Sequence, residues 1–473
     1  MSELAYLTVA DGAARLRAKT LSPVEWTRAL LERIDAIGGI YDAFLLVTAE
    51  AALAAAKRAE AEIMRGDYRG GMHGVPYAAK DIFDVPGLAT TCHSKLRANH
   101  RAAGEATAIR RLREAGAVMI GKLALHEFAI GGPAFDLPWP PARNPWTRDC
   151  HPGGSSSGSG AALALGMVPA ALGTDTGGSV RNPATCCGVV GLKPTYGAVS
   201  RAGVFPLAFS LDHVGPMTRT VEDNAILYQA IAGYDPADPT SARREVPDCL
   251  GAMKRGVKGL RVGVIEHFYK EDTEGDPEQV AAIEAAVATL RALGAKVKPL
   301  RLAPLVDWRE CNRVILQSEA YAVHQRDLQE RPEDYAAITR AKLLAGAFIP
   351  ASEYIKAQQW RTYLARQFAE AMRDCDVAVT LSSLDPPCSI DDADAITRTY
   401  ERQCRSAFNV TGTPAIAVPT GFTHDGVPLG MQIVGKAFDE PMVFRAAHAF
   451  CAATGLTERR PPVADAVPER AVA

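Results

Sequence analysis

The sequence of 473 residues lacks an excess of charge of either sign, because Lys and Arg together number 52 and Asp and Glu together number 54. Without a strongly basic surface, the chain is not predicted to bind nucleic acid or an anionic membrane through charge. It also lacks a hydrophobic run of the roughly 20 residues that span a bilayer. The longest strongly apolar stretch, residues 161–173, contains Pro169, so we predict no transmembrane segment.

A secretory signal and paired cysteines are also missing. Residues 1–20 include Glu3 and Asp11 and have no uninterrupted apolar core, so we expect a cytoplasmic protein. The ten cysteines are dispersed, and the adjacent pair Cys186 and Cys187 lacks the C-x-x-C spacing of a zinc or redox site. We therefore expect reduced, mostly buried thiols and no metal site.

The composition is that of a globular protein, with 48% apolar and 22% charged residues. Ser22 and Pro23 stand as the N-cap and the first-turn proline of a helix, which is predicted to continue until Gly38. A second, alanine-rich helix is predicted over residues 51–64. We assign residues 1–70 to a helical N-terminal segment.

From Val75 onward, short apolar segments alternate with helical patterns, which is typical of α/β layers. The clearest predicted elements are helices over 107–115 and 277–293 and strands over 117–120, 260–265 and 296–300. Residues 457–473 are rich in proline and charge and are predicted to form a surface tail. We interpret residues 1–473 as a single domain with its core at 75–225.

Two loops rich in glycine and serine lie close together, at residues 152–160 (PGGSSSGSG) and 173–179 (GTDTGGS). Each alone could be a tight turn before a helix, because glycine permits positive φ and serine caps helices. Phosphate binding is an alternative, but neither loop has the spacing of a P-loop or of a dinucleotide-binding turn. Ser156 is the centre of a G-x-S-x-G match, yet residues 146–153 are too polar for the strand that a nucleophile elbow needs.

A serine nucleophile needs a base, which is most often histidine. His151 and His213 lie near the loops, but in no recognisable motif, and we expect ordinary polar roles for them. Lys80 is the alternative base, because it ends the apolar run 73–80 and burial would lower its pKa toward neutrality. A purely structural role for Lys80 in an ion pair stays open at this point.

Taken in order, these segments resemble the amidase signature family. The resemblance is continuous over residues 74–223, from GVPYAAKDIFDVPG through GGSSSGSGAALALG and GTDTGGSVRNPATCCGVVGLKPTYGAVSRAGVFP to SLDHVGPMTRTVED. It resumes at FNVTGTPAIAVPTGF and PLGMQIVGKAFDE. It implies a Ser-cisSer-Lys triad made of Lys80, Ser155 and Ser179, and an enzyme that needs no cofactor.

The resemblance also implies a role for each residue. Ser179 would attack the amide carbonyl, and Ser155 would relay its proton to a neutral Lys80. Asp175 and Arg181 flank the nucleophile and are expected to form a supporting ion pair. The backbone N–H groups implied to form the oxyanion hole are those of Thr176, Gly177, Gly178 and Ser179.

The fold implied by the resemblance is α/β, with a large, mixed and twisted central sheet covered by helices on both faces. Substrate specificity is expected to come from two segments, residues 128–133 and 382–388. The substrate-binding residues expected in the first segment are Phe128, Ile130, Gly131 and Gly132.

The predicted function is hydrolysis of the C–N bond of a carboxamide or ureide through a serine acyl-enzyme, with release of ammonia or an amine. His126 departs from the D-E-F-A-M-G-S pattern of the A subunit of tRNA-dependent glutamine amidotransferases. We therefore favour a stand-alone amidase, a homodimer that acts on a small-molecule amide without direct contact with nucleic acid or membrane. A glutaminase A subunit of such an amidotransferase and a catalytically silent binding protein remain alternatives.

Overall fold

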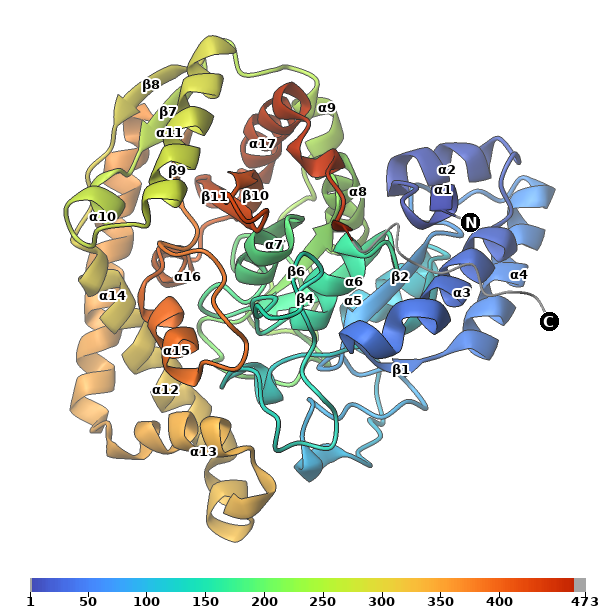
Figure 1. Cartoon of the computed structure of the whole chain (residues 1–473), viewed down its shortest axis with the longest axis horizontal. Coiled ribbons are helices and arrows are strands. Elements are labelled where there is room, and N and C mark those ends of the chain that lie inside the picture. Colours follow the sequence, from blue (N-terminus) through green and yellow to red (C-terminus); the bar gives the residue numbers. More distant parts are fainter. Residues whose placement is uncertain (1, 463–473) are drawn as a thin grey trace.

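The computed structural model describes residues 2–462, and its centre is one mixed sheet of 11 strands (Figure 1). The sheet order is β1-β3-β2-β4-β6-β5-β10-β11-β9-β7-β8. Strand β2 is parallel to β3 and β4, and β7 is parallel to β8 and β9, whereas the other neighbours are antiparallel. The strands are β1 (Phe44–Val47), β2 (Pro76–Lys80), β3 (Val118–Leu123), β4 (Ala170–Asp175), β5 (Val190–Lys193), β6 (His213–Thr218), β7 (Arg261–Val264), β8 (Lys296–Pro299), β9 (Val377–Leu381), β10 (Ala415–Phe422) and β11 (Pro428–Val434).

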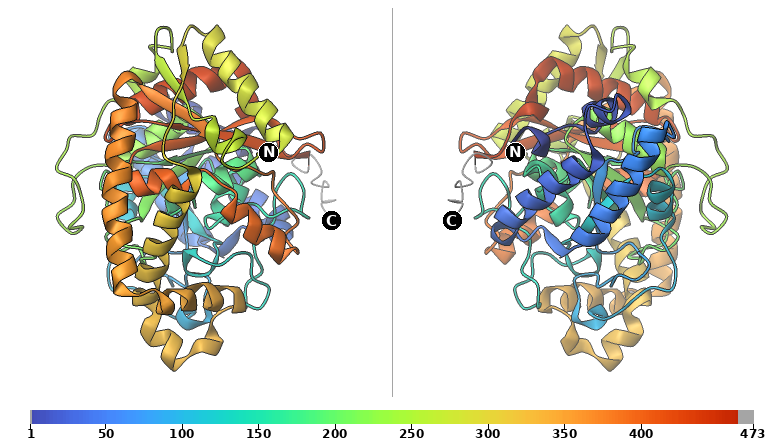
Figure 2. Two further views of the ribbon diagram at one scale, coloured as in Figure 1. Left: turned by 90° about the vertical axis from the view of Figure 1, so that its left-hand side faces the viewer. Right: turned by 90° about the vertical axis from the view of Figure 1, so that its right-hand side faces the viewer.

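Helices lie on both sides of this sheet, which confirms the predicted α/β class (Figure 2). The α-helices are α1 (Ser2–Ala5), α2 (Val9–Arg17), α3 (Pro23–Tyr41), α4 (Ala49–Arg65), α5 (Thr107–Glu114), α6 (Ser157–Ala164), α7 (Arg181–Cys187), α8 (Val221–Ile231), α9 (Cys249–Met253), α10 (His267–Lys270), α11 (Pro277–Ala292), α12 (Leu305–Glu330), α13 (Ala337–Leu344), α14 (Ala351–Ala371), α15 (Ala393–Glu401), α16 (Ser406–Thr411) and α17 (Glu440–Thr454). Short 3-10 helices are η1 (Lys95–Arg97), η2 (Glu127–Ala129), η3 (Pro332–Asp334), η4 (Ala345–Phe348), η5 (Met372–Asp374) and η6 (Leu456–Glu458). Helix α7 contacts β5, β10 and β11, and α17 contacts β10 and β11.

The N-terminal segment begins as predicted and then departs from the prediction. The Ser22 hydroxyl accepts hydrogen bonds from the first turn of α3, as an N-cap does. The helix continues past Gly38 to Tyr41 and ends at Asp42, which has a φ of 49°. The segment is also not purely helical, because β1 lies between α3 and α4 and pairs with β3.

Strand β3 shows why one sequence-based boundary was too short. The predicted strand ended at residue 120, whereas β3 runs to Leu123 and includes Lys122. Because β3 lies between β1 and β2, both of its edges are paired and its charged residue is buried. Lys122 remains there as an ion, with its Nζ 2.5 Å from Asp81 Oδ1. A polar side chain can therefore stand inside a strand when a partner compensates its burial.

The remaining predicted elements match α5, β7, α11 and β8 closely. None of the helices in residues 2–462 is long and apolar enough to cross a membrane, and the cytoplasmic location stays a prediction. All ten cysteines are free thiols, and eight of them are buried. The domain assignment stays a prediction as well. Of the predicted tail, residues 463–473 lie outside the described part, whereas Arg459 stacks on the Phe422 ring at 3.9 Å.

Candidate active site

Strands β2 and β4 bring the two serine-rich loops and Lys80 together. The two strands are parallel neighbours, so their carboxyl ends lie at one edge of the sheet. Lys80 is the last residue of β2, and the chain leaving β4 turns through residues 176–180 into α7. The first loop, which precedes α6, joins the second through a hydrogen bond from Ser156 N–H to the Ser179 carbonyl oxygen at 3.2 Å.

Lys80 is fully buried and binds hydroxyl groups only. Its Nζ donates to Ser155 Oγ at 2.7 Å and to Thr174 Oγ1 at 2.8 Å. Burial lowers the pKa of Lys80 to about 7, and the charges of Asp175 and Asp212 offset this effect only in part. A lysine with this pKa is uncharged in a large fraction of molecules near neutral pH, and it can therefore accept a proton.

Ser155 follows a cis peptide bond that joins it to Gly154. The imidazole of His126 lies directly against Gly154, where an added Cβ would collide with the ring. The Ser155 carbonyl oxygen accepts a hydrogen bond from the His126 backbone N–H at 3.0 Å. Only glycine fits at position 154, and His126 holds this loop in place.

Ser179 is partly exposed, and it lines the same cavity as Ser155. The predicted oxyanion donors need one correction. The Gly178 N–H already donates to Asp175 Oδ1 at 2.9 Å, so it is not free to bind an oxyanion. The donor set narrows to the N–H groups of Thr176, Gly177 and Ser179.

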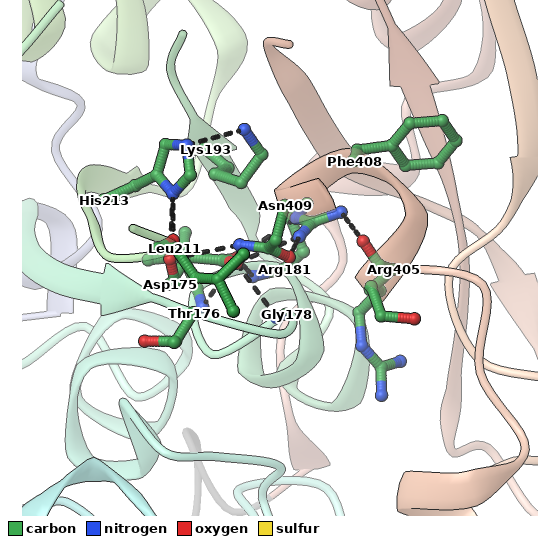
Figure 3. A network of polar contacts seen from close by, with 12 residues as sticks. Asp175, Thr176, Gly178, Arg181, Lys193, Leu211, His213, Arg405, Phe408 and Asn409 are labelled. Carbon is green, nitrogen blue, oxygen red and sulfur yellow. Dashed lines mark hydrogen bonds and ion pairs between the residues drawn. The ribbon is translucent and has the colours of Figure 1, made fainter. Parts of the chain in front are cut away.

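Asp175 and Arg181 form the expected ion pair behind the nucleophile, and Figure 3 shows the surrounding network. Arg181 donates from Nε to Oδ2 at 3.0 Å and from Nη2 to Oδ1 at 2.9 Å. Asn409 adds a hydrogen bond to Oδ1 at 2.8 Å. Burial alone would raise the pKa of Asp175, but the Arg181 guanidinium holds it well below its usual range. Both side chains are fully buried, so this pair supports the loop and does not face substrate.

The two histidines considered as bases serve other contacts. His213 lies 3.2 Å from Lys193 Nζ, and its Nδ1 contacts the Leu211 carbonyl oxygen at 2.6 Å. The ring of His151 accepts a hydrogen bond from Gly153 N–H at 3.0 Å. Within residues 2–462, neither imidazole forms a hydrogen bond with Lys80 or with a side chain of the two serines.

A cavity of about 480 Å³ opens beside the serines. Its wall includes His126, Ile130, Gly131, Ser155, Thr176, Gly177, Ser179, Lys342, Tyr400 and Arg405. Two of the four predicted substrate-binding residues, Ile130 and Gly131, therefore line it. No group of three or more His, Cys, Asp or Glu residues in the described part of the chain could hold a metal ion.

The other two predicted substrate-binding residues are wrong. Phe128 is only 1% exposed and packs in an aromatic cluster, with its ring 4.4 Å from His324 and 5.2 Å from Phe205. The backbone at residue 128 is left-handed, with a φ of 50°, which the residue order did not indicate. Gly132 lies close to Ile338 and does not line the cavity.

Sequence reasoning missed several residues of the site. Thr174 is part of the second loop and was within reach of the motif analysis. Lys342 and Arg405 come from distant segments, and no local pattern marks them. The predicted specificity segment 382–388 does not line the cavity, but Ser382 lies behind it, where its carbonyl oxygen accepts a hydrogen bond from Arg405 Nη1 at 2.9 Å.

Comparison with known proteins places this site in a family. The sequence matches the family model described as Amidase over residues 25–444. The A subunit of the glutamyl-tRNA(Gln) amidotransferase of Geobacter metallireducens is 40% identical over 96% of this chain and 98% of its own length. The crystal structure of the corresponding A subunit from Thermotoga maritima is similar with a TM-score of 0.79 and 34% identity, covering 94% of both chains. A chain of the vestigial protein complex that reveals the evolutionary origins of an s-triazine catabolic enzyme reaches a TM-score of 0.90 at 31% identity, covering 96% of this chain and 100% of its own.

These comparisons correct one expectation. A homodimer that acts on a small-molecule amide, without nucleic acid, is contradicted, because relatives of this identity and coverage are named as one subunit of an enzyme of glutamyl-tRNA(Gln). The preference for a stand-alone amidase over that subunit is not supported either. The family itself is confirmed by the match over residues 25–444 and by similarity across nearly the whole chain. The protein is an enzyme that acts on C–N amide bonds and belongs to the amidase signature family.

Proposed function

We propose that the protein is the glutaminase A subunit of a tRNA-dependent amidotransferase, with Ser179, Ser155 and Lys80 as its catalytic triad. The observation that carries the triad is the 2.7 Å hydrogen bond from the buried Lys80 Nζ to Ser155 Oγ. Both serines line one cavity, so a carboxamide bound there can reach Ser179 while Ser155 stays in contact with the lysine.

The reaction begins with attack of Ser179 Oγ on the amide carbonyl carbon. Ser155 Oγ accepts the proton of Ser179 and passes its own proton to the neutral Nζ of Lys80. The carbonyl oxygen becomes an oxyanion, which accepts hydrogen bonds from the N–H groups of the 176–179 turn. Each such donor contributes about 2.7–4 kcal/mol of transition-state stabilisation in comparable enzymes.

Collapse of the tetrahedral intermediate breaks the C–N bond. The proton on Lys80 returns through Ser155 to the leaving nitrogen, so ammonia departs neutral and an acyl-enzyme remains on Ser179. Water then attacks the ester carbonyl, and the same relay removes and returns its proton. The cycle ends with the free acid and the original hydroxyl of Ser179.

The relatives named as the A subunit of an amidotransferase support this assignment, because their similarity covers 96% of this chain. In this proposal ammonia released at Ser179 serves the amidation of glutamyl-tRNA(Gln) by partner subunits. The assignment replaces the small-amide homodimer that the departure at His126 suggested.

The test is to express the full chain with its native partner subunits and to measure ammonia release from glutamine and formation of glutaminyl-tRNA(Gln). We expect both reactions, and loss of both in Ser179→Ala. Labelling of Ser179 by a serine-directed probe, together with ammonia release but no amidation of the tRNA, would retain the amidase and reject the amidotransferase. Failure of Ser179 to label would favour the catalytically silent binding protein.

A further inference from the structure

Arg405 lies at the wall of the active-site cavity and next to the nucleophile loop. It directly precedes α16, and its side chain is only 1% exposed. A Cβ atom placed on Gly178 would collide with Arg405 at Nε. The guanidinium is therefore in contact with the residue that precedes Ser179.

Only one edge of this guanidinium is used by the protein. Its Nη1 donates to the carbonyl oxygen of Ser382 at 2.9 Å and to the Ser383 hydroxyl. Its Nε is buried and has no hydrogen-bond partner within residues 2–462. Arg181 shows how the same edge works when it is occupied, because its Nε and Nη2 hold both oxygens of Asp175. In Figure 3 the Arg405 guanidinium points away from that network, and no drawn contact reaches it.

Lys342 is a second cation of the cavity wall without a carboxylate bonded to it. Its Nζ donates to the Gly131 carbonyl oxygen at 2.5 Å and lies 5.1 Å from the centre of the Tyr400 ring. A carbonyl and an aromatic face are neutral partners, so the positive charge is not neutralised.

The carboxylates of the cavity do not change this balance. Glu310 is bound by two other cations of the wall, Arg309 at 3.1 Å and Arg313 through the opposite oxygen. Glu401 is exposed, and it forms no ion pair with Lys342 or Arg405 among the described residues.

A buried cation without an anion is unfavourable, and a guanidinium edge with two N–H groups matches a carboxylate. We infer that Arg405 and Lys342 form a carboxylate-binding subsite, and that the substrate is a carboxamide whose acyl part carries a carboxylate. This inference rests on the proposed hydrolysis at Ser179 and deepens it by naming the substrate class. Because Arg405 touches Gly178, the bound carboxylate lies within a few bonds of the carbonyl that Ser179 attacks.

The test compares matched amides with and without the carboxylate. Glutaramate and succinamate are paired with pentanamide and butanamide, and kcat/KM for ammonia release is measured with the full chain. We expect the wild type to favour the carboxylated member of each pair by about 30-fold or more, as a buried charged hydrogen bond does. Arg405→Met and Lys342→Met should each reduce this ratio by about tenfold or more. Arg313→Met, which removes a cation already paired with Glu310, is the matched control and should leave the ratio within about threefold.

Two further measurements keep the outcome clear. Because Arg405 also binds Ser382 and Ser383, Arg405→Met could fail to fold; Arg405→Lys keeps the charge but loses the paired edge, and it should also reduce the ratio. Calorimetric binding of glutaramate and pentanamide to Ser179→Ala measures the subsite without turnover. Preferential binding of glutaramate would support the subsite even if no tRNA is amidated, which separates this inference from the proposed function. Equal kcat/KM for paired amides in the wild type, or an unchanged ratio in folded Lys342→Met and Arg405→Lys, would overturn it.

Discussion

Two buried arginines lie on opposite sides of the nucleophile loop, and they differ in what they bind. Arg181 uses all three of its nitrogens, since Nε and Nη2 bind Asp175 while Nη1 donates to Gln432 Oε1 at 2.7 Å. Arg405 leaves its Nε without a partner in the described chain and lines the cavity. A saturated guanidinium stabilises the fold, whereas an unsaturated one at a cavity marks a place for a ligand.

The same contrast separates two buried lysines. Lys122 lies 2.5 Å from the carboxylate of Asp81, whereas Lys80 contacts only the hydroxyls of Ser155 and Thr174. Burial alone therefore does not identify a base. The lysine that lacks an anion is the one whose ammonium form is destabilised, and only such a lysine can take up a proton near neutral pH.

The largest expected effect is that of Ser179→Ala, which removes the proposed nucleophile. Turnover should fall by about 10⁴-fold or more, because residues of a catalytic unit are lost together. The melting temperature should stay close to that of the wild type, because the hydroxyl faces a cavity and no core contact is removed. More than about one per cent of residual turnover in a purified, folded variant would exclude Ser179 as the nucleophile.

The contrast between the two lysines is tested by the pair Lys80→Met and Lys122→Met. Lys80→Met should lose turnover by about 10²–10⁴-fold and keep its stability at pH 7, since an apolar side chain replaces a poorly solvated amine. Lys122→Met should instead lose stability by about 3–5 kcal/mol, because it leaves Asp81 buried without its cation. Turnover and urea midpoints of both variants are the measurements.

Lys80→Arg sharpens the same point. A guanidinium keeps its proton, so this variant should be nearly inactive although its charge is retained. If Lys80 only formed an ion pair, the arginine would be tolerated. An active Lys80→Arg enzyme is incompatible with lysine as the base.

On the interior side of the loop, Asp175→Asn should destabilise the fold. It leaves Arg181 buried without its anion, and we expect the free energy of unfolding to fall by about 3–5 kcal/mol. Asp376→Asn removes the half-exposed partner of Arg261 and serves as the control, with little change in the urea midpoint. Similar midpoints for the two variants would contradict the special role of the interior pair.

A smaller effect is expected from pH. Turnover should rise with pH through the pKa of Lys80 at about 7 and stay high above it. Between this value and about pH 10 the unfolded chain holds a proton on Lys80 that the folded chain lacks, so this residue makes stability rise with pH. Lys80→Met should flatten that rise in urea titrations, and an unchanged slope would show that Lys80 stays charged in the fold.

The smallest effect is expected from chelators. Because no metal-binding group exists in residues 2–462, incubation with EDTA should leave turnover unchanged. Loss of activity that returns on addition of a divalent metal would contradict this expectation.

The sequence by itself determined the parts of this protein that depend on contiguous residues. Ser22 and Pro23 marked the start of α3, because capping uses neighbours along the chain. The two glycine- and serine-rich loops and the run ending at Lys80 indicated the triad residues in the same way.

Only the tertiary structure decided which groups are satisfied and which remain open. Phe128 belongs to the core because a left-handed backbone redirects its side chain, and periodicity does not report φ. The Gly178 N–H is occupied because Asp175 turns back onto it. Arg405 and Lys342 meet the nucleophile loop from segments more than a hundred residues away, and whether a cation is paired depends on every element packed around it. Hydrogen bonding and burial are properties of the assembled fold, so no local pattern could have shown them.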